Sequence, residues 1–178
     1  MKIIGLDLSP NSTKPSGMSK MIDNSIYFFS TFSDSQIRKD IFEFKPDLVV
    51  VSSPLLGTSK KFRKCDYELK RREFKVQAMD TDYMKKLLSR TKKIRDSVKK
   101  VKFIETNAPA SGKILSFDKS DELKYLRRMR TLGFVNMNKP KNTREMNAGI
   151  NVIVGYLRNI GMAEELGDKI KIVIPIIK

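Results

Sequence analysis

Histidine is absent from the 178 residues of this chain, and cysteine occurs once. The absence of histidine excludes a Ser-His-Asp triad, a Cys-His pair and the common zinc sites. The single cysteine excludes an intramolecular disulfide and predicts a cytoplasmic setting. Any catalysis must therefore rest on carboxylates, lysine, tyrosine, serine or Cys65. A bound metal would be a hard cation rather than zinc.

Long apolar runs are absent too, so no segment of the sequence is expected to cross a membrane. The start of the chain lacks the basic region, apolar core and small-residue cleavage site of a signal peptide. Hydrophobic residues still make up 40% of the chain, which is enough for a packed core. We find no repeat, no low-complexity linker and no second core pattern, and we predict a single domain over residues 1–178.

Acidic residues are few relative to basic ones: 20 Asp and Glu face 36 Lys and Arg, giving a net charge of +16. Such an excess suits a polyanionic partner. Nucleic acid is favoured over a membrane surface because no amphipathic terminal anchor is evident. The alternative is a lysine-rich, solvated surface that serves solubility or heat tolerance, since basic charge alone carries no sequence-specific signal.

The segment Lys2–Pro10 opens with an apolar run that predicts a buried strand. Side chains alternate along a strand, so Ile4, Leu6 and Leu8 share one face while Asp7 lies on the other. A carboxylate on a core strand is costly unless it is paired, hydrogen-bonded or bound to a metal. Asp7 is therefore a candidate functional residue. The alternative is that it only caps the following turn.

The rest of the chain predicts a three-strand meander followed by alternating helices and strands. The second and third strands are Met18–Ile22 and Ser25–Phe29, joined by a turn at Asp23-Asn24. The later elements are a helix ending at Pro46, a strand over 48–51, a basic helix within 59–75, one or two helices over 82–100, a strand over 101–107, a helix over 118–132, a helix from 142 to Gly161 and an apolar strand or tail over 170–177. This order predicts an α/β, ribonuclease-H-like fold, with a mixed five-stranded sheet of three antiparallel and further parallel strands flanked by helices.

Five patches of the sequence resemble a family of predicted ribonuclease-H-like nucleases long catalogued as a domain of unknown function. Arg63–Leu69 matches that family's Arg-x-Cys-Asp-x-x-Leu, and the match is the most specific of the five. The other four patches resemble motifs of that family in residue type and follow one another in the same order along the chain: Gly5-Leu6-Asp7, Ser52-Ser53-Pro54-Leu55, Phe103–Ser111 and Asn147-Ala148. The resemblance covers most of the chain and places it in the ribonuclease-H-like and resolvase superfamily.

The resemblance implies a nuclease that hydrolyses phosphodiesters with Mg²⁺ or Mn²⁺. In this superfamily a carboxylate cluster holds two ions about 3.5–4 Å apart. Asp7 and Glu105 would be the metal ligands, and Asp66 would assist catalysis. Ser52 and Asn147 stand where the family has acids, so the site is partly degenerate. The second hypothesis is therefore a catalytically inactive nucleic-acid-binding or scaffolding module that keeps the fold and the charge.

The basic segment around Arg63 is the predicted substrate-binding surface. Its candidate phosphate contacts are Lys60, Arg63, Lys64, Arg71 and Arg72, with Phe62 or Tyr67 offering a ring on which a base can stack. The alternatives are a lattice of surface ion pairs, with Phe62 in the core. Cys65 lies on the apolar stripe of the same helix and is expected to be a small core residue rather than a nucleophile.

Overall fold

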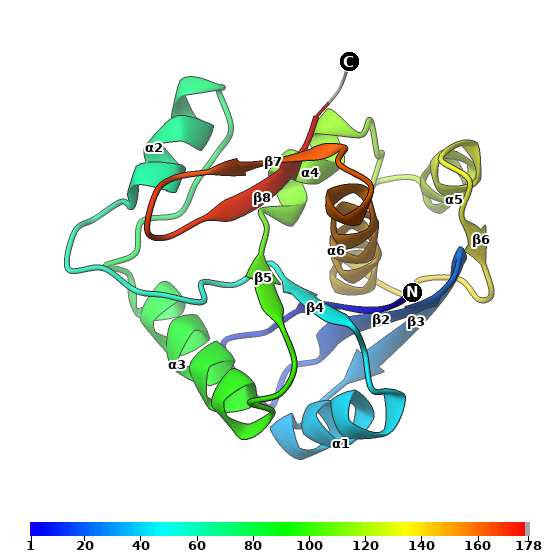
Figure 1. The fold of residues 1–178 in the computed structure, drawn as a ribbon, viewed down its shortest axis with the longest axis horizontal. Helices are drawn as coiled ribbons and strands as arrows, with labels where there is room; N and C mark the ends of the chain where they lie inside the picture. The colour runs from blue at the N-terminus through cyan, green and yellow to red at the C-terminus, as the bar shows by residue number, and fades with distance from the viewer. Residues whose placement is uncertain (177–178) are drawn as a thin grey trace.

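A six-stranded mixed sheet runs through the protein, with helices on both of its faces (Figure 1). The computed structural model describes residues 1–176. In chain order the elements are β1 (Lys2–Asp7), β2 (Ser16–Ile22), β3 (Ser25–Thr31), α1 (Asp34–Phe44), β4 (Leu48–Val51), α2 (Lys64–Arg71), α3 (Asp82–Ser97), β5 (Phe103–Glu105), α4 (Ala108–Ile114), α5 (Glu122–Thr131), β6 (Val135–Asn136), α6 (Thr143–Asn159), β7 (Ala163–Leu166) and β8 (Ile172–Pro175).

The strand order of the sheet is β5-β4-β1-β2-β3-β6. β1, β2 and β3 form the predicted antiparallel meander, β4 pairs parallel to β1, and β5 pairs parallel to β4. The five predicted strands are all present. The two-residue β6, parallel to β3, is a sixth that the sequence pattern did not indicate. Parallel pairing brings the carboxyl ends of β1, β4 and β5 to one edge of the sheet.

The two faces of the sheet carry separate apolar clusters because side chains alternate along each strand. Ile3 of β1 packs with α6 residues such as Ile150 and Ile153. Ile4 and Leu6 face the other way, toward α1 and α3. Asp7 belongs to the α6 face, as the alternation along β1 predicted.

Two glycines let α6 approach the sheet at backbone distance. A Cβ atom added to Gly5 would lie 2.0 Å from the carbonyl oxygen of Ala148. One added to Gly17 would lie 2.0 Å from the carbonyl oxygen of Arg144. No side chain other than hydrogen fits in these places. The first two turns of α6 are therefore pressed against the ends of β1 and β2.

The helix ends follow the capping pattern expected from the sequence. Ser33 accepts a hydrogen bond from the backbone N–H of Gln36 at 3.1 Å, and Asn142 accepts one from Glu145 at 3.0 Å. The predicted helix within 59–75 is shorter than expected. It starts only after Arg63, whose backbone N–H donates to the Asp66 carboxylate at 2.8 Å.

The last part of the chain forms a two-stranded antiparallel sheet of β7 and β8 rather than a single strand or tail. It packs on α2 and α4 through a small apolar cluster that includes Cys65, Leu69 and Ile174. Residue 177 of the predicted strand lies outside the described residues. None of the helices within residues 1–176 has the length and apolar character needed to cross a membrane.

Candidate functional site

A cavity of about 660 Å³ opens at the edge of the sheet where β1, β4 and β5 end. The predicted site residues that line it come from five parts of the chain: Asp7, Ser52, Glu105, Asn147 and, from α2 and its N-cap, Asp66 and Arg63. The structure therefore brings together the residues that the sequence placed at strand ends and on the last helix. The contacts of each one decide what the cavity can bind.

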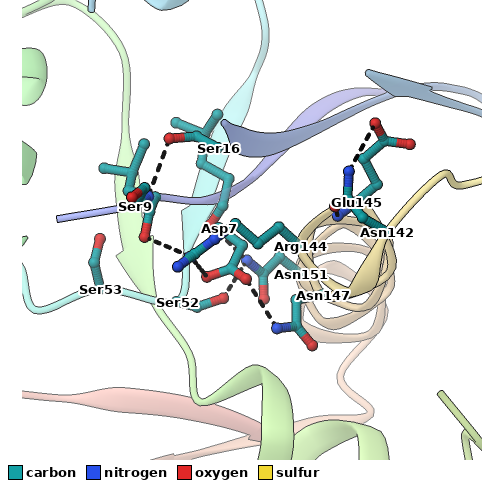
Figure 2. A network of polar contacts seen from close by, with 12 residues as sticks. Asp7, Ser9, Ser16, Ser52, Ser53, Asn142, Arg144, Glu145, Asn147 and Asn151 are labelled. Carbon is teal, nitrogen blue, oxygen red and sulfur yellow. Dashed lines mark hydrogen bonds and ion pairs between the residues drawn. The ribbon is translucent and has the colours of Figure 1, made fainter. Parts of the chain in front are cut away.

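Asp7 lies among cationic and amide groups rather than among other acids (Figure 2). Its Oδ2 accepts a hydrogen bond from Asn147 Nδ2 at 2.8 Å, and its Oδ1 lies 3.7 Å from Arg144 Nη1. The side chain is 14% exposed. Burial raises the pKa of Asp7, although Asn147, Arg144 and Lys119 act in the opposite direction. The carboxylate is thus already satisfied by this chain.

The amide of Asn147 connects two oppositely charged groups. Its Oδ1 accepts a hydrogen bond from Lys119 Nζ at 2.9 Å, while its Nδ2 donates to Asp7. Burial lowers the pKa of Lys119, against the influence of Asp7. An aspartate at position 147 would keep the contact with Lys119 but would place a second carboxylate against Asp7. Asparagine is therefore the side chain that suits this bridge.

Ser52 is held by a second asparagine of α6. Asn151 is fully buried and donates from Nδ2 to the Leu6 carbonyl oxygen at 2.7 Å and to Ser52 Oγ at 2.6 Å (Figure 2). Because Ser52 Oγ accepts this bond, its own proton is available to a group in the cavity. The sequence analysis missed Asn151. Its signal was a polar residue within the apolar stripe of α6, one turn after Asn147.

Arg63 forms a buried ion cluster with two carboxylates. It donates from Nε and Nη2 to the two oxygens of Asp66, both at 2.9 Å. It also contacts both oxygens of Glu105, with Nη1 to Oε2 at 3.0 Å and Nη2 to Oε1 at 2.7 Å. Glu105 Oε2 accepts a further bond from the Leu55 backbone N–H at 2.8 Å.

Burial works against charge on Arg63 and Glu105, but Arg63 stays ionised. Desolvation lowers the pKa of Arg63, and the contacts with Asp66 and Glu105 outweigh it, so that the pKa rises above the usual value. Burial raises the pKa of Glu105, with Arg63 opposing. The side chains of Arg63, Asp66 and Glu105 are 4%, 1% and 4% exposed. The cluster is therefore a fixed part of the fold that lines the cavity with side chains almost closed to solvent.

These contacts do not fit the pair of Mg²⁺ ions that the resemblance implies. Two adjacent divalent ions need several carboxylates to offset their charge. The oxygens of Asp66 and Glu105 are bonded to Arg63, which leaves Asp7 as the carboxylate of the cavity outside that cluster. Over residues 1–176, no three His, Cys, Asp or Glu side chains are grouped so that they could hold a metal ion.

The predicted phosphate contacts around α2 fall into three groups. Arg63 is buried. Arg72 Nη2 lies 2.9 Å from Glu164 Oε2, and Lys64 Nζ lies 3.5 Å from Asp168 Oδ2, so these two cations are paired with acids of the chain. Lys60 and Arg71 are exposed, and neither makes an ion pair within the described part of the chain. The last two are therefore the better candidates for contact with phosphate.

An aromatic pair accompanies these cations. The Phe62 and Tyr67 rings meet edge to face with their centroids 5.6 Å apart, and Lys70 Nζ lies 4.1 Å from the Phe62 centroid. Tyr67 is half exposed, and Phe62 is half-buried against it rather than in the core. Cys65 is buried in the small cluster beneath, and burial raises its pKa to about 12, as expected for a packing residue.

Comparisons with known proteins identify the fold. Neither a protein-family model nor a curated protein matches the sequence. Among solved structures, RuvC of Thermus thermophilus in complex with a Holliday junction substrate matches with a TM-score of 0.56 and 10% identity, over 92% of this chain and 98% of RuvC. A second Thermus thermophilus RuvC structure matches with a TM-score of 0.54 and 11% identity, over 90% and 97%. The chain has a ribonuclease-H-like fold. At this level of identity the likeness shows the fold alone, and it confirms the predicted fold class.

Proposed function

We propose that this protein binds nucleic acid across the cavity and α2, and that it does so without two-metal hydrolysis. The observation that carries the second half is the Arg63 cluster, in which one guanidinium occupies the oxygens of both Asp66 and Glu105. A cavity whose carboxylate oxygens are already bonded to groups of the chain offers few ligands and little free negative charge to a pair of divalent ions.

Three observations support nucleic acid as the partner. The net charge is +16. Lys60, Lys70 and Arg71 are exposed cations of α2 and the segment before it, and Lys70 lies over the ring of Phe62 in an aromatic pair, a combination suited to phosphate contact and base stacking. The fold is also that of RuvC, one of whose structures contains a Holliday junction.

Metal-dependent hydrolysis is the alternative, and Asp7 is the residue that favours it. Its carboxylate stands at the end of β1, inside the cavity and outside the Arg63 cluster. Calorimetric titration of Mg²⁺ and Mn²⁺ into the purified protein, with a nuclease assay on the same sample, separates the two functions. The proposal predicts little binding heat and no cleavage. Robust cleavage that is lost in Asp7→Asn would establish the alternative.

The binding half is tested by charge reversal on α2. The triple variant Lys60→Glu, Lys70→Glu and Arg71→Glu should weaken binding to a generic duplex or single strand and lower the slope of log K against log salt by about 2–3. Lys64 and Arg72 are left unchanged because acids of the chain already pair with them. Fluorescence anisotropy between about 50 and about 200 mM salt measures both quantities.

The matched control reverses three lysines elsewhere: Lys45, Lys99 and Lys100, which line a separate cavity at the ends of α1 and α3. Figure 1 places α1 far from α2. The control changes the net charge by the same amount and should leave the salt slope nearly unchanged. Equal losses in the two triple variants would mean that only the total charge acts. If the wild type shows no detectable binding at low salt, nucleic acid is not the partner, and the excess of basic residues only forms a solvated surface.

A further inference from the structure

We infer that the cavity at Asp7 holds one backbone phosphate of the nucleic acid directly, on Arg144, Asn147 and Ser52, with cations of the chain in the role that metal ions would have. This inference rests on the proposed function and adds to it the place and chemistry of one contact. Figure 2 shows these three side chains around Asp7, reaching it from α6 and from the end of β4.

The balance of charge at the cavity favours an anion. Its carboxylates are Asp7, Asp66 and Glu105. Arg63, Arg144 and Lys75 line the same cavity, and Lys119 lies directly behind Asn147. The three cations that line the cavity equal its three carboxylates in number, and Lys119, bonded to Asn147, adds a fourth positive charge beside them. A divalent ion at Asp7 would also lie close to the Arg144 guanidinium, and like charges at such distances repel strongly in a partly buried site.

Unused hydrogen-bond donors point to the same chemistry. Arg144 Nη1 donates to the Leu8 carbonyl oxygen at 3.0 Å, whereas its Nε and Nη2 have no acceptor within residues 1–176. Asn147 uses one amide proton on Asp7, and the described residues offer no acceptor for the other. Ser52 accepts from Asn151, and its hydroxyl proton likewise has no acceptor among them. Guanidinium, amide and hydroxyl donors are the groups that bind phosphate oxygens.

Asp7 then acts as an orienting residue that opposes the ligand. Its carboxylate positions Arg144 and Asn147, while its charge repels a phosphate bound to them. Removing the charge of Asp7 should therefore raise the affinity for nucleic acid, whereas at a metal site it would not. Asp7→Asn keeps an oxygen that can accept from Asn147 but removes the charge, so affinity for a short oligonucleotide should rise by about five- to tenfold in EDTA. Loss of a metal ligand would lower affinity or leave it unchanged.

Two variants at Arg144 test the donor side. Arg144→Gln should lower oligonucleotide affinity by about tenfold, and Arg144→Lys, which keeps the charge, should recover part of the loss.

Glu43→Gln on α1 is the charge-matched control for Asp7→Asn. Its side chain is 61% exposed and α1 packs on the face of the sheet opposite α6, so affinity should change less than about twofold. Thermal melting of each variant confirms that it is folded.

The outcomes distinguish this inference from the proposed function. If the wild type binds and Asp7→Asn binds equally or more weakly, the phosphate contact is overturned while nucleic-acid binding stands. If Mg²⁺ strengthens wild-type binding and Asp7→Asn abolishes that gain, the cavity is a metal site and the inference fails. If the wild type and every variant fail to bind at low salt, both proposals fail together. A rise in Asp7→Asn with a fall in Arg144→Gln is the result that supports the phosphate contact.

Discussion

Arg63 is the residue whose energetic role differs most from its expected one. The sequence placed it among surface cations that follow a phosphate backbone, whereas its side chain is 4% exposed and contacts two buried carboxylates. Removing one partner of a buried ion cluster is costly because the remaining charges lose their compensation in a region of low dielectric. The guanidinium is therefore part of what holds α2 to the end of β5.

Arg63→Met should destabilise the protein by about 3–5 kcal/mol, since Asp66 and Glu105 would be left buried without a counter-charge. Arg72→Met provides a control of the same residue type in the same region. Arg72 pairs with Glu164 at the surface, where its side chain is 43% exposed, and its removal should cost less than about 1 kcal/mol. Urea unfolding at neutral pH measures both. A loss for Arg63→Met as small as that for Arg72→Met would contradict a structural role for the cluster.

The sequence could indicate which residues lie around the cavity but not which hydrogen bonds and ion pairs each of them forms. The resemblance indicated Asp7, Ser52, Glu105 and Asn147, and the parallel pairing of β1, β4 and β5 explains why the first three lie at one edge of the sheet. Arg144 and Lys119 were missed because neither lies in a patch that resembles the family. The Arg63 contact to Glu105 spans 42 positions, and no local pattern encodes it.

At the scale of elements, strong periodicity made β1 to β4, α1, α3 and α6 predictable from the sequence. The misses were short. β6 has two residues, β7 has four, and α4 has seven, with Pro109 and Gly112 within α4. None of the three provides a full period of apolar residues. The close approach of α6 to β1 was equally hidden, because a glycine in a strand signals a possible close contact but does not name the partner.

Gly5→Ala tests that approach. The added Cβ would lie 2.0 Å from the Ala148 carbonyl oxygen, so backbone must move and α6 must shift away from β1. We expect a loss of about 2–4 kcal/mol, in the range of severe overpacking, together with weaker oligonucleotide binding as Arg144 and Asn147 move from Asp7. Gly57→Ala is the control, since the nearest atom there belongs to the movable Leu88 side chain at 2.6 Å. Equal losses in the two variants, measured by thermal melting, would show that α6 accommodates the methyl group.

At the scale of the whole molecule, the fold and the lining of the cavity depend on different features of the sequence. The order of elements was sufficient to predict a ribonuclease-H-like sheet, and the likeness to RuvC confirms it at 10–11% identity. The lining of the cavity depends on which residue occupies each lining position, and the order of elements does not determine that. Placing acids at positions 52 and 147, where the resembled family has them, therefore asks whether the scaffold permits a metal site.

The double variant Ser52→Asp with Asn147→Asp places two carboxylates beside Asp7. Mutual repulsion between the three acids should lower stability without metal, and a divalent ion should recover it. We expect Mg²⁺ to raise the melting temperature of the double variant and not that of the wild type. Calorimetry should detect binding only in the variant.

The control adds two acids at exposed positions outside the cavity, Asn24→Asp with Asn159→Asp, and should give no response to Mg²⁺. Arg144 sets the limit of the gain, because its Nη1 lies 3.7 Å from Asp7 and opposes any cation bound there. Adding Arg144→Gln to the double variant should therefore tighten Mg²⁺ binding further, by about tenfold for a nearby charge in a partly buried site. If neither variant gains affinity for Mg²⁺, the side chains at positions 52 and 147 do not converge on Asp7 as the structure places them. A gain in both, in the order stated, would show that the cation at position 144 and the neutral side chains at positions 52 and 147 together keep metal out of this cavity.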